Sequence, residues 1–218
     1  MINIKTTNDG SNTLYSSRFN EHYHSTFGAI EESNCVYIEA GLNHSRLNSI
    51  KVFEVGFGTG LNAILTCAES LKRPLTVEYT AIELYPVELE IINHLNYMDF
   101  LTVDQKSVCK KIQTCKWNKK VKISDNFTLQ KINSDFIHYE FQEKYDLIYF
   151  DAFAPDKQPE MWEPENFIKI YESLNNEGLL TTYSSKGSVK INLRKAGFKV
   201  TRLKGPTGKR HILRAEKI

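Results

Sequence analysis

The apolar residues of this chain gather in short runs that alternate with longer stretches of helical spacing. A short apolar run between turn-forming residues is typical of a buried strand, whereas apolar positions three and four apart predict a helix. The expected strands cover residues 51–55, 76–83, 127–135, 145–150 and 178–185, and the expected helices 61–72, 86–95, 163–175 and 187–197. Strands that alternate with helices form a parallel sheet, so the pattern predicts an α/β fold. A closing pair, residues 198–204 and 208–215, adds an antiparallel terminal strand.

Four segments show weaker patterns. Residues 1–20 are polar, and we expect them to be loosely structured. Residues 20–33 read as a loop that enters a short helix, and residues 36–42 fit a short strand or a helix end. Residues 97–122 read as an irregular basic insertion with a helix near its middle.

The segment Lys51–Leu65, KVFEVGFGTGLNAIL, organises the rest of the prediction. It reads as a buried strand, a turn containing Gly56, Gly58 and Gly60, and a helix that begins near Leu61. Glycines accept positive φ and let a ligand approach the backbone, and a helix N-terminus offers unpaired N–H groups. The segment predicts a cofactor loop, although a purely structural turn produces the same pattern.

Glu54 narrows the choice of cofactor. The dinucleotide fingerprint is G-x-G-x-x-G, whereas this chain has E-x-G-x-G-x-G. A carboxylate at this position repels a diphosphate and favours a cofactor that carries positive charge, such as S-adenosylmethionine. The alternative is that Glu54 is a polar residue at a strand end, paired with a nearby donor.

Composition bounds the class of protein. A chain of 218 residues with 41% hydrophobic and 25% charged residues is typical of a soluble globular protein. We expect one domain overall, with residues 1–50 as an N-terminal extension packing on a Rossmann-like core of residues 51–218. The sequence shows no signal peptide, no membrane-spanning run and no metal-ligand spacing among its four cysteines. We therefore expect a cytoplasmic protein with no metal and no membrane partner.

Charge is distributed unevenly along the chain. Residues 186–218 contain eleven Lys or Arg and a single acid, Glu216, although the net charge of the whole chain is only +2. Such an asymmetry indicates a polyanionic partner. A second group of lysines in residues 106–122 fits an ordinary solvated surface.

Acidic residues end three of the predicted strands: Glu83, Asp135 and Asp151. In open α/β sheets the carboxyl ends of the strands form the ligand crevice. With the glycine loop under a methionine group, Glu83 suits the ribose hydroxyls and Asp135 the adenine. Each acid taken alone also fits a helix N-cap.

Asp151 and the loop after it suit the reacting group. A carboxylate can orient a neutral amine and accept the charge that develops when the amine attacks. Phe153 and Pro155 can wall such a pocket. Tyr23 and His24, in the loop near the N-terminus, can line the same site or simply form hydrogen bonds within their loop.

Six motifs resemble, in order, a family that hypermodifies the wobble uridine of tRNA, namely the methyl-transferring half of MnmC and its stand-alone relative MnmD. The motifs are YHSTFGAIEE, FEVGFGTGLN, AIELYP, FDAFAPDKQPEMW, TTYSSKGSVKINLRKAGF and GPTGKRHIL. The resemblance implies a class I S-adenosylmethionine-dependent methyltransferase of Rossmann-like fold. It implies N-methylation of the 5-aminomethyl group of (2-thio)uridine, giving the 5-methylaminomethyl form, with Asp151 as the catalytic acid/base.

The complete predicted site follows from these arguments together. The cofactor residues are Glu54, Gly56, Phe57, Gly58, Thr59, Gly60, Asn62, Glu83, Leu84, Asp135, Tyr23 and His24. The substrate residues are Phe153, Pro155, Lys186, Lys190, Arg194, Lys209 and Arg210. The expected partner is the anticodon stem-loop of tRNA, with functional coupling to a separate flavin oxidase.

Three other functions fit part of this pattern. Aminopropyl transferases share the glycine loop and the acids at strand ends. Another class I methyltransferase acting on a different amine is a second alternative. A non-catalytic RNA-binding module is the third, because a fold does not fix a function.

Overall fold

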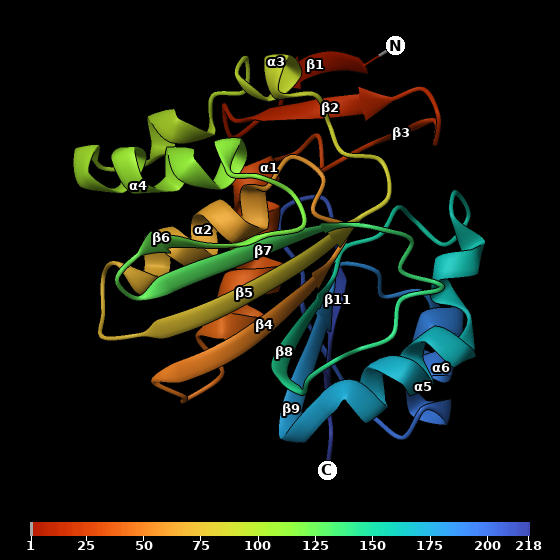
Figure 1. Cartoon of the computed structure of the whole chain (residues 1–218). Helices are drawn as coiled ribbons and strands as arrows, with labels where there is room; N and C mark the ends of the chain where they lie inside the picture. Colours follow the sequence, from red (N-terminus) through yellow and green to blue (C-terminus); the bar gives the residue numbers. More distant parts are fainter. Residues whose placement is uncertain (1) are drawn as a thin grey trace.

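The computed structural model describes residues 2–218 and is built around one eight-stranded sheet (Figure 1). The strand order is β10-β11-β9-β8-β4-β5-β7-β6. The parallel strands are β4 (Ser49–Val55), β5 (Thr76–Glu83), β7 (Phe127–Asn133), β8 (Tyr145–Phe150) and β9 (Leu174–Thr182). The α/β fold with a mostly parallel sheet, predicted from the sequence, is confirmed.

Three further strands complete the sheet at its two edges. β11 (His211–Glu216) pairs antiparallel with β9 and with β10 (Lys199–Lys204), as the closing strand pair predicted. At the other edge β6 (Lys120–Ser124) runs antiparallel to β7. The sequence did not predict β6, because an edge strand rich in lysine lacks the apolar run of a central strand.

Helices cover both faces of the sheet, and successive side chains of each strand point to opposite faces. Leu147 and Tyr149 of β8 join the core beneath the first group of helices, whereas Ile148 and Phe150 join the core beneath the second. The first group contains α1 (Ala29–Ser33), η1 (Asn34–Leu42), α2 (Leu61–Ser70) and α4 (Val103–Thr114), and the second α5 (Pro164–Ser173) and α6 (Gly187–Lys195). Short helical turns, α3 (Leu89–Ile92), η2 (Tyr97–Phe100) and η3 (Pro159–Trp162), occupy the connecting loops.

The N-terminal segment is more regular than its composition predicted. It forms a separate antiparallel sheet of β1 (Ile2–Thr6), β2 (Asn12–Ser16) and β3 (Glu21–His22), seen above the main sheet in Figure 1. The expectation of a loosely structured segment was wrong, because a polar turn fixes this hairpin. Asp9 accepts hydrogen bonds from the Ser11 backbone N–H and the Thr7 hydroxyl, and Gly10 has φ +86°.

The segment expected to be a strand or helix end, residues 36–42, belongs to the π-helix η1. The expected insertion around residues 97–122 contains α4, which begins at a capping box formed by Thr102 and Gln105. These two helices pack on α2, and α2 follows the glycine turn.

Lys131 of β7 is a buried cation beneath α4. Its side chain is 1% exposed, and its Nζ donates to the carbonyl oxygens of Ile112 and Gln113 at 3.1 and 3.2 Å. The same ammonium lies 5.3 Å from the ring centroid of Phe57 and 5.0 Å from that of Trp117. The lysine therefore satisfies the end of α4 and supports the glycine turn from behind.

None of the helices within residues 2–218 combines the length and apolar character needed to cross a membrane. Over the same residues, no group of three or more His, Cys, Asp or Glu side chains is arranged to hold a metal ion.

Candidate functional site

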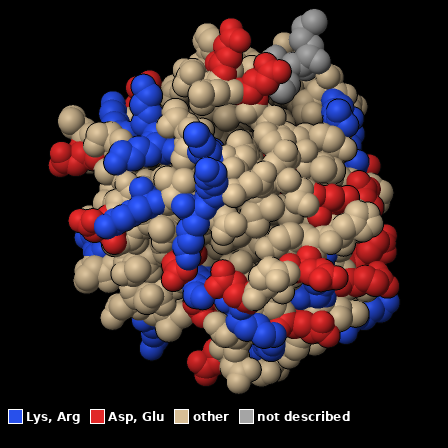
Figure 2. Space-filling model, in the orientation of Figure 1, with Lys and Arg blue, Asp and Glu red and all other residues tan. Residues whose placement is uncertain are grey.

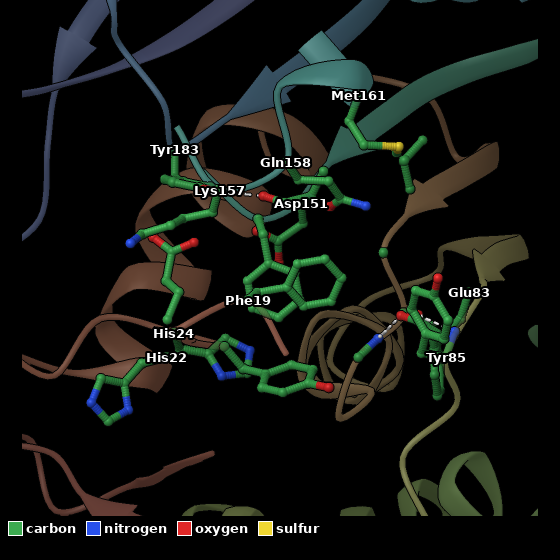
Figure 3. Close-up of a pocket in the computed structure, with 18 of the residues that line it drawn as sticks. Phe19, His22, His24, Glu83, Tyr85, Asp151, Lys157, Gln158, Met161 and Tyr183 are labelled. Atoms are coloured by element: carbon green, nitrogen blue, oxygen red, sulfur yellow. Dashed lines mark hydrogen bonds between the residues drawn. The ribbon is translucent and has the colours of Figure 1, made fainter. Parts of the chain in front are cut away.

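A cavity of about 690 Å³ opens at the carboxyl ends of β4, β5, β7 and β8. This is the edge of the sheet where the sequence predicted a ligand site. Residues 19–27 and the loop between β10 and β11 close over it. In Figure 3, Glu83 and Tyr85 lie at one end of the cavity and His22 and His24 at the other, with Asp151 between them.

The glycine turn lines the cavity, and the packing around it requires glycine at two positions. A Cβ on Gly56 would lie 2.5 Å from the backbone oxygen of Asp151, and Gly56 has φ +90°. A Cβ on Gly60 would lie 2.8 Å from the Phe57 ring, at φ +79°. These glycines are required by the protein's own packing as well as by the tight turn. The turn brings Asn62, in the first turn of α2, to the cavity wall.

Asp151 lies at the end of a chain of buried polar groups. The Tyr37 hydroxyl donates to its Oδ1 at 2.5 Å, and Asn62 Nδ2 donates to its Oδ2 at 2.8 Å. Asn62 Nδ2 also donates to Glu54 Oε1 at 2.9 Å. Glu54 is completely buried and lies behind Asn62 without lining the cavity.

The acidity of these carboxyl groups is shifted by their surroundings. Burial raises the pKa of Asp151 to about 7, against the hydrogen bonds from Tyr37 and Asn62, which lower it. Burial also raises the pKa of Glu54 well above its usual range. Asp151 is therefore poised between its acid and base forms near neutral pH, as a group that exchanges a proton with a substrate needs to be.

Glu83 is held by backbone N–H groups from the glycine turn and from the segment after β5. Its Oε2 accepts the Gly58 N–H at 2.9 Å, and its Oε1 accepts the Tyr85 N–H at 2.8 Å. Each oxygen keeps a second acceptor position, and the side chain lines the cavity. Asp135 also lines it, while its Oδ1 accepts the Ile137 N–H at 2.9 Å. None of these acids forms a side-chain N-cap of a helix within residues 2–218.

Aromatic rings close the side of the cavity beyond Asp151. Phe153, a predicted substrate residue, stacks on Phe19 with ring centroids 4.3 Å apart and contacts the edge of Tyr23 at 5.1 Å. Glu21 fixes the same junction, since its Oε2 accepts the Ala154 N–H at 2.9 Å. The N-terminal segment therefore forms one wall of the site.

The end of the cavity near His24 is polar. Lys209 forms an ion pair with Glu32, and its Nζ lies 4.0 Å from the ring centroid of Tyr183. Lys209 was predicted as a substrate residue. In the structure its ammonium lines the cavity and is paired with a buried carboxylate.

Twelve of the predicted residues line the cavity: Tyr23, His24, Gly56, Phe57, Gly58, Asn62, Glu83, Leu84, Asp135, Asp151, Phe153 and Lys209. Eight do not: Glu54, Thr59, Gly60, Pro155, Lys186, Lys190, Arg194 and Arg210. Thr59 is buried against the Tyr97 hydroxyl at 3.1 Å, and Lys186 pairs with Asp156 at 2.6 Å on the surface. Helix α6 starts at the cavity edge of the sheet and runs away from it, so Arg194 lies at its far end.

Sequence reasoning missed four residues that shape the site: Phe19, Glu32, Tyr37 and Tyr183. Phe19 and Glu32 lie in segments with no strand pattern, and Tyr37 points from the unpredicted π-helix. Tyr183 stands at the end of a predicted strand, TTYSS, directly after the buried residues of β9. The rule that selected acids at strand ends would have found it if it had included hydroxyl groups.

The charge in the cavity favours a cationic ligand. Six acidic side chains line it, against two lysines, and one of those lysines is paired with one of the acids. Asn62 Oδ1 is buried and has no hydrogen-bond partner within residues 2–218. An ammonium group would supply the missing donor, and a sulfonium would suit the acidic wall. The residues present therefore fit S-adenosylmethionine.

Comparisons with known proteins agree with this chemistry. A family model described as S-adenosyl-L-methionine-dependent methyltransferase matches residues 91–218. The tRNA 5-methylaminomethyl-2-thiouridine biosynthesis bifunctional protein MnmC of Actinobacillus pleuropneumoniae is 26% identical, over 96% of this chain and 34% of that protein. The protein of the same name from Campylobacter hominis is 28% identical, over 93% of this chain and 31% of that protein. The chain thus spans about a third of the length of these curated relatives.

Solved structures give the same picture. MNMC2 from Aquifex aeolicus superimposes with a TM-score of 0.82 at 26% identity, covering 99% of this chain and 70% of that one. Spermidine synthase from Thermotoga maritima has a TM-score of 0.65 at 14% identity, a likeness of fold alone. The resemblance seen in the sequence motifs is confirmed. The chain belongs to the family of S-adenosyl-L-methionine-dependent methyltransferases, and S-adenosylmethionine is its methyl donor.

Proposed function

We propose that this chain methylates the 5-aminomethyl group of the wobble (2-thio)uridine of tRNA, giving the 5-methylaminomethyl form. The observation that carries the proposal is Asp151, a carboxylate with a pKa of about 7 at the floor of an acid-lined cavity. Such a site suits an amine, which enters as a cation and has to lose a proton before it attacks. The names of the MnmC relatives supply the substrate class.

Different residues along the cavity would bind different parts of the cofactor. Asn62 offers an unpaired acceptor for the amino group, with Glu54 holding its amide from behind. Glu83 keeps acceptor positions for the ribose hydroxyls, and Asp135 lies further along the same edge. When bound, S-adenosylmethionine supplies a methyl group on a positively charged sulfur, and that sulfur keeps the electron pair of the broken bond.

Asp151 acts on the amine of the substrate. Its carboxylate takes up the proton that the ammonium form of the substrate loses before attack. It then holds the neutral amine by hydrogen bonding while the nitrogen forms its bond to the methyl carbon. Tyr37 and Asn62 fix both carboxylate oxygens, so the acceptor is oriented before the substrate arrives. Phe19 and Phe153 keep water away from this point.

Basic residues at the edges of the sheet support an RNA substrate. Residues 105–124 contain seven lysines and no acid: Lys106, Lys110, Lys111, Lys116, Lys119, Lys120 and Lys122. Figure 2 shows lysines gathered over α4 and β6. We call this set the β6 basic edge. The second basic group, in α6, β10 and the following loop, lies at the opposite end of the strand order, with the cavity between. A phosphate backbone crossing the cavity mouth can meet the β6 basic edge and those members of the second group that lie at the cavity edge, at the start of α6 and in the loop after β10.

We infer that the anticodon stem-loop is the part of tRNA that binds, because the wobble base lies in a single-stranded loop and needs little unpairing energy to enter a pocket. The aminomethyl group would come from a separate flavin oxidase or another enzyme that modifies the wobble uridine. The activity belongs in the cytoplasm, where tRNA is the available substrate.

The test uses the purified chain, S-adenosylmethionine and a synthetic anticodon stem-loop bearing 5-aminomethyluridine. We expect a nucleoside heavier by one methyl group in mass spectrometry after digestion, and a strongly reduced rate of its formation with the Asp151→Asn variant. RNA binding without product would favour a non-catalytic module. Reaction of a polyamine with decarboxylated S-adenosylmethionine, and not of the RNA, would favour aminopropyl transfer.

A further inference from the structure

The polar end of the cavity contains an ion pair that stability alone does not explain. Glu32 is 6% exposed, and its Oε1 accepts the Ser25 N–H at 2.9 Å while its carboxylate pairs with Lys209. Burying an ion pair costs desolvation energy, and apolar residues of the same volume often stabilise a protein equally well. This pair also faces the cavity that contains Asp151. A role in binding is therefore the better explanation.

Two neighbouring acids of α1 hold the loop that carries Lys209. Glu31 accepts the Thr207 hydroxyl at 2.7 Å and the Thr207 N–H at 3.1 Å, while Glu32 pairs with Lys209. The loop itself is tight, with Gly208 at φ +82°. The position of the ammonium is thus fixed by a helix on one side and by the Tyr183 ring on the other.

Lys209 has hydrogen-bond donors that its contacts with Glu32 and Tyr183 do not use. An ammonium group has three N–H donors and no acceptor. Glu32 takes up part of this capacity, and the Tyr183 ring stabilises the charge without accepting a conventional hydrogen bond. A neutral acceptor on a ligand, such as a carbonyl oxygen, would use the remainder without disturbing the ion pair.

The chemistry of the substrate identifies that acceptor, if the proposed function holds. In 5-aminomethyluracil, the carbon next to the one that carries the aminomethyl group bears the 4-oxygen. When Asp151 binds the amine, the 4-oxygen therefore lies beside it. Tyr183 places Lys209 near Asp151. The Nζ of Lys209 lies 4.0 Å from the Tyr183 ring centroid, and the Tyr183 hydroxyl donates at 2.9 Å to the carbonyl oxygen of Ala152, the residue after Asp151.

We propose that Lys209, positioned by Glu32, donates to the 4-oxygen of the pyrimidine and selects a ring that carries a carbonyl beside the aminomethyl group. This inference rests on the proposed function and adds a specificity-determining residue to it. His24 closes the same end of the cavity. Burial lowers the pKa of His24 to about 4, so the imidazole stays neutral near pH 7. It therefore adds no second positive charge beside the ammonium of Lys209.

The test compares two anticodon stem-loops that differ in one atom group. One carries 5-aminomethyluridine, and the other carries the same nucleoside without its 4-oxygen. We expect the wild-type chain to methylate the first with a kcat/KM roughly tenfold to a hundredfold higher, the range for a hydrogen bond to a charged group. Equal rates for the two substrates would overturn the proposal, and this comparison needs no variant.

Variants then assign the preference to Lys209. Lys209→Met should lose most of the preference by slowing the 4-oxo substrate while leaving the analogue nearly unchanged. An equal slowing of both substrates would mean that Lys209 acts only through Asp151 or through folding. Glu32→Gln should reduce the preference in part. Lys51→Met is the matched control, because it removes an ion pair with Glu143 at the opposite end of β4.

Two outcomes distinguish a failure of the proposed function from a failure of the role of Lys209. If the wild-type chain binds S-adenosylmethionine and methylates neither RNA, the assignment of a wobble aminomethyl substrate fails, and the role of Lys209 fails with it. Methylation of both RNAs at one rate leaves the proposed function intact and rejects only the role of Lys209.

Discussion

The Tyr37 hydroxyl donates a 2.5 Å hydrogen bond to Oδ1 of Asp151, across 114 residues of sequence. This bond stabilises the carboxylate form and lowers the pKa of Asp151, against burial, which raises it. Tyr37 is itself buried, and burial beside Asp151 raises the pKa of its hydroxyl well above the usual range. It therefore stays protonated, and a hydrogen-bond donor, throughout the neutral pH range.

Tyr37→Phe should shift the pH dependence of methylation. Without the donor, the pKa of Asp151 rises further above 7, so the base form appears only at higher pH. We expect a clear loss of kcat/KM near pH 7 and recovery towards pH 9, measured by initial rates across that range. A loss of equal size at every pH would mean that Tyr37 supports only the fold of η1.

Asp151→Asn should slow methyl transfer by about 10²–10⁴-fold, because the amide keeps the shape but accepts no proton. The affinity for S-adenosylmethionine should change little, since Asn62 and Glu83 hold that ligand. Single-turnover rates and calorimetric titration measure the two quantities separately. Wild-type turnover would remove Asp151 from the chemistry.

The same substitution should change how stability depends on pH. The pKa of Asp151 is about 7 in the folded chain, above the ordinary value of 3.8, so folding favours its protonated form. Its stabilising contribution is present below about pH 4 and is lost as the pH rises through 7. Relative to wild type, Asp151→Asn should therefore gain about 1–3 kcal/mol of unfolding free energy between pH 5 and pH 8. Urea titrations at the two pH values measure this, and a constant difference would contradict it.

Glu83→Ala should weaken S-adenosylmethionine binding by about 1–3 kcal/mol, the scale for leaving hydrogen-bonding groups unpaired. The loss has two sources, because the carboxylate also holds the Gly58 and Tyr85 N–H groups. Glu83→Gln keeps an acceptor and should lose less. Glu90→Ala, an exposed change on α3, is the control, and equal affinities in all four proteins would leave Glu83 a purely structural role.

Neutralising the β6 basic edge should weaken RNA binding and its salt dependence. Lys110, Lys116 and Lys119 form no ion pair within residues 2–218, so changing them to Gln leaves no carboxylate unpaired. Each lost phosphate contact should flatten the log–log salt slope by roughly 0.7–0.9. A control equal in charge changes Lys51, Lys72 and Lys199, near the amino ends of the strands, to Gln, although the first two also lose ion pairs with Glu143 and Glu69. Equal slopes in the two triple variants would mean that this edge is only a solvated surface.

The central strands were predictable because buried strands have continuous runs of apolar residues in the sequence. β5 and β8 have the predicted bounds, and β4 and β7 differ from them by two residues at one end. The N-terminal hairpin was not predictable, because its pairing depends on a polar turn. Strand β6 was not predictable either, because it lies at the edge of the sheet and lacks an apolar run. β9 begins at Leu174, four residues before the predicted start, because residues 175–177 are exposed and polar and do not show the apolar run of a strand.

The part of the site formed by acids at strand ends was predictable from the sequence. The part formed by the N-terminal segment, which folds over the ends of those strands, was not. Parallel strands bring Glu83, Asp135 and Asp151 to one edge, so their meeting follows from topology. Glu32 and Phe19 reach the same cavity from the N-terminal segment, and only tertiary packing brings them there. Lys209 was grouped with the other basic residues of the C-terminal segment, because the sequence shows its charge and not its buried partner.

The buried ammonium of Lys131 has a consequence for how this protein can change. Lys131→Met would leave the last carbonyls of α4 without a donor, while removing Trp117 or Phe57 would strip the cation of an aromatic neighbour. Each single change is therefore harmful alone, and a tolerated replacement has to alter the lysine and its surroundings together. Since Phe57 belongs to the glycine turn, substitutions at the end of α4 are expected to affect the methyl-donor site. These positions are expected to show strong epistasis, with double substitutions departing from the sum of the single ones.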